Sequence, residues 1–198
     1  MIPHLVDENG RLIRSGKRVN DERWKTEESR AELFPYNEVY REIKAQYDRF
    51  IELTGRKPEY LNGHSIISET MIKAIKKISD DENIPFAFDY MQTLFTTFEL
   101  KDEDEKDEDN ASVTKIFNPE AQIKKDPLGK FLRHKDELLK HEIVMSIGHP
   151  GYVDAELLAN SSLSLERCKD LEYVTSPLVK KFIDENKVEL IDYRDLEK

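Results

Sequence analysis

The chain of 198 residues has one cysteine, Cys168, which excludes an intrachain disulfide and a thiolate metal cluster. The residues around Cys168 read as helix and no histidine is near in sequence, so a small half-buried residue is a better interpretation than a nucleophile. No run reaches the roughly 18 apolar residues that a membrane span needs. The N-terminus lacks the basic and apolar pattern of a secretory signal, so we predict a cytoplasmic protein.

A cluster of basic residues is also missing, and acidic residues outnumber basic ones by 41 to 31, giving a net charge of −10. This balance disfavours nucleic acids and anionic membranes as partners and leaves a neutral or cationic small substrate open. Residues 101–110 form an acidic run without the spaced ligands and turn glycine of a calcium loop. We interpret this run as a solvated loop insertion.

Helical and strand patterns alternate along most of the chain, after a polar stretch at 7–32 that reads as loop. In the first strong helix, Val39, Ile43, Tyr47, Phe50 and Ile51 are spaced to share one apolar face. Such alternation is typical of a parallel α/β sheet or barrel, although the four strong strands are too few for a closed (β/α)₈ barrel. Helices are predicted at 36–54, 69–78, 130–140, 165–171 and 177–185, and strands at 59–62, 84–88, 143–147 and 188–191, with a further candidate at 94–98.

Two of the five histidines, His64 and His149, each follow the end of a predicted strand. Pro150 biases His149 toward extended backbone geometry, and the carboxyl ends of parallel strands are where catalytic groups gather. Neutral imidazole binds divalent metals and also suits acid–base chemistry near neutral pH. The alternative is a pair of turn histidines with ordinary hydrogen bonds, since two histidines do not define a metal site. We expect the other three histidines to be solvated surface residues, at His4, His134 and His141.

Three stretches resemble the YdjC-like carbohydrate deacetylase family. Residues 41–64 contain Gln-x-x-Arg-Phe at the end of a helix, then Thr-Gly-Arg-x-Pro, then a strand that ends Leu-Asn-x-His. Residues 148–154 contain His-Pro-Gly-Tyr, and the tail 167–196 contains Thr-Ser-Pro and Tyr-Arg-Asp-Leu. The resemblance runs in order over residues 5–198.

This resemblance implies a TIM-like (β/α) barrel that hydrolyses the acetamido group of N-acetylated sugars such as chitooligosaccharides. It also implies a divalent metal, magnesium or zinc, held by one aspartate and two histidines, with His64 at the second histidine position. His149 matches the His-Pro histidine of the family and is expected to act as an acid or base, or to support the oxyanion. Tyr152 and Asp154 are expected either to line the sugar pocket or to pack the loop.

Some of the family pattern has no counterpart in this sequence. The Asp-Asp-Phe-Gly motif and the first metal histidine are not found, and Asn62 stands where the family has an aspartate. We therefore expect one YdjC-like domain over residues 1–198, incomplete at its N-terminus, with a metal that is weakly bound or absent. Open strand edges would favour self-association into a homo-oligomer. Two interpretations stay open: a metal-dependent deacetylase whose missing strands lie elsewhere, or a non-enzymatic remnant that binds a sugar or a protein.

Overall fold

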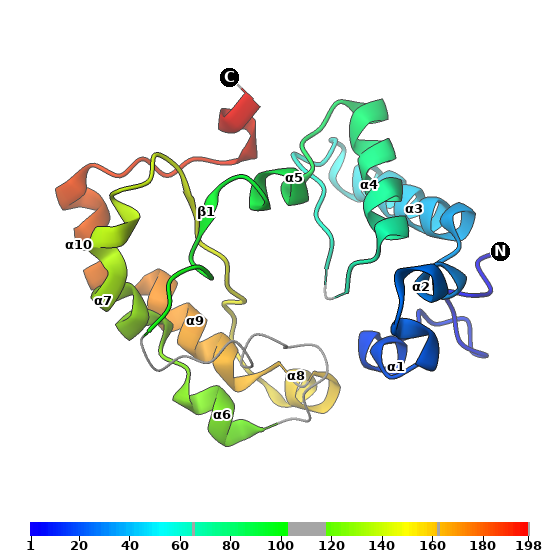
Figure 1. Ribbon diagram of the computed structural model, residues 1–198, viewed down its shortest axis with the longest axis horizontal. Helices are drawn as coiled ribbons and strands as arrows, with labels where there is room; N and C mark the ends of the chain where they lie inside the picture. The colour runs from blue at the N-terminus through cyan, green and yellow to red at the C-terminus, as the bar shows by residue number, and fades with distance from the viewer. Residues whose placement is uncertain (65, 103–117, 162, 198) are drawn as a thin grey trace. The chain divides into compact units, whose positions relative to one another are not determined.

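The computed structural model describes residues 1–64, 66–102, 118–161 and 163–197, and it divides the chain into two compact units (Figure 1). Unit 1 takes in the described residues of Met1–Gln92 and Asp192–Lys198, and unit 2 those of Thr93–Ile191. Residues 103–110 of the predicted acidic insertion lie outside the described residues. Within the described ranges, no helix combines the length and apolar character needed to cross a membrane.

Unit 1 is built on two amphipathic helices, α3 and α4, which pack against each other. Helix α3 ends where Gly55 adopts the left-handed region at φ 71°, and α4 begins where the Ser68 hydroxyl accepts a hydrogen bond from the Met71 amide at 3.3 Å. Both boundaries are those that the sequence predicts, although α4 continues four residues further. The helices of this unit are α1 Ser15–Val19, η1 Glu22–Trp24, α2 Glu27–Leu33, α3 Tyr36–Thr54, α4 Glu69–Glu82, α5 Ala87–Met91 and η3 Tyr193–Glu197.

The stretch 7–32 is not the loop that the sequence predicts, because α1, η1 and α2 lie within it. These helices are three to seven residues long, too short to show a periodic apolar face. Local capping stabilises them instead. At the start of α2, the Thr26 hydroxyl accepts a hydrogen bond from the Ser29 amide at 3.2 Å, and the two side chains form a capping box. Arg18 is buried and donates to the carbonyls of Leu33 at 3.1 Å and His4 at 2.6 Å.

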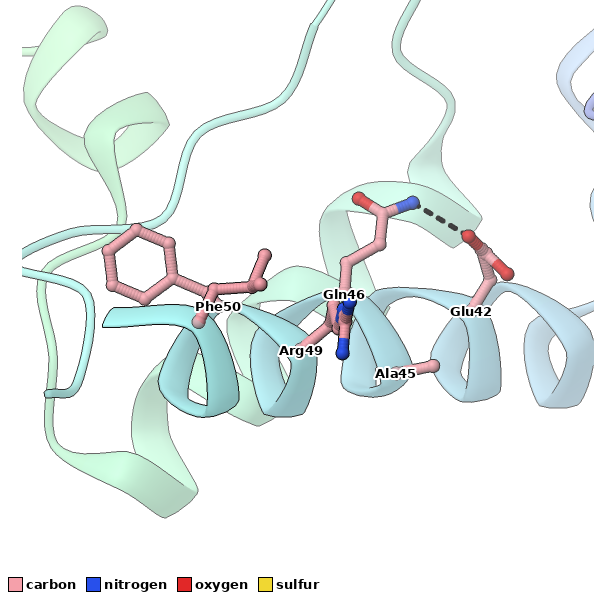
Figure 2. A pocket seen from close by; sticks show the side chains of 6 residues that line it. Glu42, Ala45, Gln46, Arg49 and Phe50 are labelled. Carbon is pink, nitrogen blue, oxygen red and sulfur yellow. Dashed lines mark hydrogen bonds between the residues drawn. The ribbon is translucent and has the colours of Figure 1, made fainter. Parts of the chain in front are cut away.

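The outer face of α3 carries a shallow apolar patch that includes Phe50 and Leu53 (Figure 2). Phe50 was expected on the inward face, yet its side chain is partly exposed, whereas Val39 and Tyr47 are buried. At 100° per residue, Ile51 continues the buried stripe and Phe50 falls beside it. The residues that line the patch are Glu42, Ala45, Gln46, Arg49, Phe50 and Leu53, and Gln46 donates to Glu42 at 2.8 Å.

Unit 2 packs α7, α9 and α10 around an aromatic core. The Phe131 and Phe182 rings meet edge to face with centroids 5.2 Å apart, and the Tyr173 ring lies 5.5 Å from that of Phe131. Ser176 caps α10, as the sequence predicts, by accepting from the Leu178 amide at 3.2 Å. The elements of this unit are β1 Phe95–Thr96, α6 Pro119–Lys124, α7 Pro127–Leu138, β2 Val144–Met145, α8 Ala155–Asn160, α9 Leu165–Thr175 and α10 Pro177–Asn186.

Helix α9 takes its N-terminal cap from another helix. Ser164 occupies the cap position, but its own side chain makes no capping hydrogen bond. The Gln122 side-chain oxygen, on α6, instead accepts from the amides of Ser164 at 3.2 Å, Leu165 at 2.8 Å and Glu166 at 3.4 Å. Lys125 also forms an ion pair with the largely buried Glu166. Two contacts therefore tie the first turn of α9 to the end of α6.

Strand pairing among the described residues is limited to short contacts, one of them an antiparallel bridge between Val6 and Leu12. Strands β1 and β2 pair in parallel over two residues, and Leu61 and Phe86 form an isolated parallel bridge. The prediction of a strand at 84–88 is wrong beyond that bridge, because Ala87 begins α5. The strand predicted at 188–191 is wrong too, because those residues form no strand. The described residues thus form a helix-rich α/β protein with one sheet of two strands, and they do not form a barrel.

Candidate functional site

His64 follows a short extended segment that is fixed by the bridge to the start of α5. The Leu61 amide donates to the Pro85 carbonyl at 2.8 Å, and the Ala87 amide donates to the Leu61 carbonyl at 2.8 Å. The Ile66 amide then donates to the His64 carbonyl at 2.9 Å, turning the chain toward α4. The parallel bridge therefore fixes the segment that leads into His64, which precedes α4 as the sequence predicts.

The segment has one exposed and one covered face. Tyr60, Asn62 and His64 are exposed, whereas Leu61 and Gly63 between them are half-buried. A side chain at Gly63 would approach Ile67 to 3.1 Å, so this face lies against neighbouring apolar groups. Because side chains of an extended chain alternate between two faces, Tyr60, Asn62 and His64 lie on the same exposed face.

His149 lies in a loop that unit 2 anchors through backbone amides. The Ile147 amide donates to the Thr97 hydroxyl at 3.0 Å, which continues the β1–β2 pairing. The His149 amide then donates to the Asp170 carboxylate on α9 at 2.7 Å. The Gly151 amide donates to the carbonyl of Arg167, one helical turn before Asp170, at 3.3 Å. The backbone of the loop is thus held against α9 while the His149 side chain is exposed.

The two other predicted site residues follow His149 in the same loop. Tyr152 is 88% exposed, so it does not pack the loop, which was one of the two expectations for it. Asp154 caps α8, since its carboxylate accepts from the Leu157 amide at 2.8 Å. Asp154 therefore has a structural role in starting α8, and a sugar contact by either residue stays a prediction.

The structure places His64 in unit 1 and His149 in unit 2. The meeting of the two imidazoles stays a prediction. Within the described part of the chain, neither imidazole forms a hydrogen bond or an ion pair. Both side chains are consequently available to a ligand or to a reacting group.

The expected metal is not matched by a set of ligands. Across residues 1–64, 66–102, 118–161 and 163–197, no group of three or more histidine, cysteine, aspartate or glutamate side chains could hold a metal ion. Cys168 is exposed on α9, which differs from the half-buried position that its sequence suggests. Catalytic zinc takes about three protein ligands, so the described residues do not fit the metal that the resemblance implies.

The remaining histidines are more engaged than the sequence predicts. The His4 Nδ1 atom lies 2.6 Å from the Glu38 carboxylate, and the His134 Nε2 atom lies 2.8 Å from that of Asp102. Hydrogen bonds from Arg133, and then from His134, hold the pKa of the Asp102 carboxyl well below its usual range.

His141 stacks on the Phe95 ring, with centroids 3.8 Å apart and planes 8° from parallel. His4 is exposed, as the sequence predicts, although its ring contacts Glu38. His134 and His141 are half-buried and in contact with other side chains, so the prediction that they are solvated surface residues is corrected.

The arrangement of motifs matches one family of known proteins. The sequence profile of the YdjC-like protein family matches residues 1–185. The chain belongs to the YdjC-like family. Carbohydrate deacetylase 2 of Listeria innocua is 31% identical to this YdjC-like chain over 202 residues, which cover 98% of the chain and 70% of the relative.

More distant relatives of this YdjC-like chain have similar names. A carbohydrate deacetylase of Clostridium beijerinckii is 22% identical over 97% of the chain and 70% of its own length. A chitooligosaccharide deacetylase of Proteus mirabilis is 22% identical over 88% of the chain and 67% of its own length. The family resemblance predicted from three motifs is thereby confirmed.

Tyr60 is an exposed residue of the segment before His64 that the sequence analysis of this YdjC-like protein did not single out. The pattern that could have found it was present, because Tyr60 stands four residues before His64 in a predicted strand. Residues separated by two and four positions share one face of a strand. That rule places Tyr60 on the same face as Asn62 and His64 from the sequence alone.

Proposed function

We propose that this chain acts on N-acetylated sugars and removes the acetyl group from their acetamido nitrogen. The observation that carries the proposal is the match of nearly the whole chain to relatives named as carbohydrate deacetylases. The exposed imidazoles of His64 and His149, each following a strand or bridge, support it. Their side chains are free of hydrogen bonds within the described residues.

The reaction needs proton transfers that an imidazole can perform. Water adds to the carbonyl carbon of the acetamide, the C–N bond breaks, and acetate and a free amine leave. A general base takes a proton from the water, and a general acid returns one to the departing nitrogen. We assign this proton transfer to His149, because an imidazole can both accept and donate a proton.

No step is assigned to a metal, because the described residues do not supply its ligands. His64 would contribute one nitrogen ligand to a magnesium or zinc ion, and a single ligand is expected to hold such an ion weakly. We predict that the purified chain binds neither ion more tightly than about micromolar, which corresponds to roughly −8 kcal/mol. Isothermal titration with each ion measures this directly.

A second function is favoured by the same shortage of ligands. A chain that retains the sugar-binding surface without a complete metal site would act as a sugar- or protein-binding module. A deacetylase would release acetate and a binding module would not, whereas a sugar could bind to either. They can therefore be separated by measuring both quantities on one preparation.

The test is acetate release from N-acetylglucosamine oligomers, with and without added magnesium or zinc. We expect His149→Ala to lower the rate about 100-fold or more, the usual contribution of a general acid–base group. His4→Ala is the matched control, because His4 is paired with Glu38, and we expect it to leave the rate unchanged. Sugar binding without acetate release under every metal condition would support the binding module instead.

Three further expectations belong to this proposal. We propose that the fold is part of a TIM-like barrel in a single YdjC-like domain, which the parallel β1–β2 pairing and the parallel bridge at Leu61 support. We propose a cytoplasmic location. We also propose self-association of the chain, because exposed apolar side chains remain on it, among them Leu53 and Leu190.

A further inference from the structure

Three tyrosine rings from distant parts of the sequence meet in unit 1. The Tyr60 and Tyr193 ring centroids are 4.6 Å apart, with the planes tilted by 47°. The Tyr90 ring also contacts the Tyr193 ring, with the centroids 5.6 Å apart and the planes tilted by 40°. The rings come from the segment before His64, from α5 and from η3. We call Tyr60, Tyr90 and Tyr193 the tyrosine cluster.

The cluster is partly open to solvent. Tyr60 is 45% exposed although Tyr193 packs against it, while Tyr90 and Tyr193 are half-buried. Burial, followed by the proximity of Tyr60, raises the pKa of Tyr193. The two half-buried rings thus form a fixed support behind an accessible aromatic side chain.

Charged groups lie beside the aromatic surface. The Glu59 carboxylate accepts a hydrogen bond from Arg56 at 2.6 Å and pairs with Arg194 at 3.1 Å. Arg194 also donates to the carboxylate of Asp192. Glu59 directly precedes Tyr60, and Asp192 and Arg194 flank Tyr193 in sequence. Carboxylates and guanidinium groups offer acceptors and donors in fixed geometry, which suits a ligand rich in hydroxyl groups.

The cluster shares a face with the candidate site. Tyr60, Asn62 and His64 are all exposed, and the alternation of side chains along an extended chain places them on one side of the segment. Four residues of extended chain span about 13 Å, which is longer than one sugar ring. A ligand that reaches from Tyr60 to His64 must therefore contain more than one sugar unit.

A pyranose ring has the chemistry that this surface would bind. Its axial C–H bonds carry partial positive charge and match the negative face of a tyrosine ring, while its hydroxyl groups lie around the edge. We propose that the tyrosine cluster is a stacking subsite for one unit of an N-acetylated oligosaccharide, whose neighbouring unit lies toward His64. This inference rests on the proposed function for its substrate class, and it adds the residue that selects oligosaccharides over monosaccharides.

The test is sugar binding to the full chain, measured by NMR titration with N-acetylglucosamine and its dimer and trimer. We expect the trimer to bind more tightly than the monomer. Tyr60→Ala should weaken trimer binding by roughly two- to tenfold, the range of one aromatic contact, and leave monomer binding unchanged. Tyr60→Phe keeps the ring and should bind the trimer as the parent does, which separates lost stacking from lost folding.

Tyr36→Ala is the matched control, because Tyr36 is 41% exposed and also stacks on another tyrosine, Tyr40. Equal trimer affinity in Tyr60→Ala and Tyr36→Ala would overturn the subsite, as would equal affinity of the parent for monomer and trimer. Failure to bind any of the sugars would also overturn it, and binding of a proline-rich peptide alone would identify a different aromatic recognition surface. Tyr60-dependent trimer binding without acetate release would retain the subsite and refute the deacetylase proposal.

Discussion

Replacing Asp170 with alanine should release the loop that carries His149 without unfolding unit 2. The Asp170 carboxylate is the acceptor for the His149 amide at 2.7 Å. It also lies close to Gly148, where an added side chain would meet it at 3.3 Å. One side chain on α9 thus holds the His149 amide and lies close to the residue before it.

The size of the effect follows from the kind of hydrogen bond that is lost. A hydrogen bond to a charged group contributes about 1.5–3 kcal/mol when it is well protected. Asp170 is half-buried, so water competes for its carboxylate and we expect a loss of about 1–2 kcal/mol. A loss of this size opens the loop roughly 5- to 30-fold more often.

Hydrogen exchange of the His149 amide measures this opening directly. Asp170→Ala should speed its exchange by that factor, and Asp170→Asn by less, because an amide oxygen still accepts a hydrogen bond. Glu172→Ala is the control, since Glu172 lies on the same helix and its carboxylate pairs with Lys169 at 3.8 Å. Equal exchange at His149 in the Asp170→Ala and Glu172→Ala proteins would refute the role assigned to this contact.

Three further predictions concern stability. Phe131→Ala should lower the free energy of unfolding by about 3–5 kcal/mol, seen in urea denaturation of the full chain, because this buried ring packs at the centre of unit 2. Gly55→Ala should cost about 1 kcal/mol because Gly55 has φ 71°, whereas Gly16→Ala in α1, where a side chain meets open space, should cost nothing. A hydrogen bond from Arg23 lowers the pKa of Asp21 to about 2 from 3.8, so its contribution to stability is present above about pH 4 and is lost as the pH falls toward 2. The urea midpoints of parent and Asp21→Asn should therefore converge near pH 2, and a difference that persists there would contradict the ion pair.

The long helices could be predicted because their information is local. Helix α3 has an apolar stripe over 19 residues and a glycine at its end, and α10 has Ser176 and Pro177 at its start. Strands could not be predicted equally well, because a strand exists only where a partner supplies hydrogen bonds. Residues 188–191 have strand composition and form no strand, while residues 84–88 pair only at Phe86.

The candidate site shows the same division between local and distant information. Motifs and strand ends were sufficient to identify His64 and His149 as exposed residues that follow short parallel contacts. The anchors of the His149 loop could not be inferred, because Asp170 lies 21 residues further along the chain. The paired states of His4 and His134 were missed for that reason too, since their carboxylate partners are 34 and 32 residues away.

The cap that Gln122 provides for α9 connects α6 to the loop of His149, although the two segments are not adjacent in sequence. The loop of His149 takes its position from α9, and the first turn of α9 takes its position from the side chain of Gln122 on α6. Shortening or replacing that glutamine would leave three amides at the start of α9 without their acceptor. A substitution at Gln122 can thereby alter the position of the loop that carries His149, although Gln122 lies on another helix.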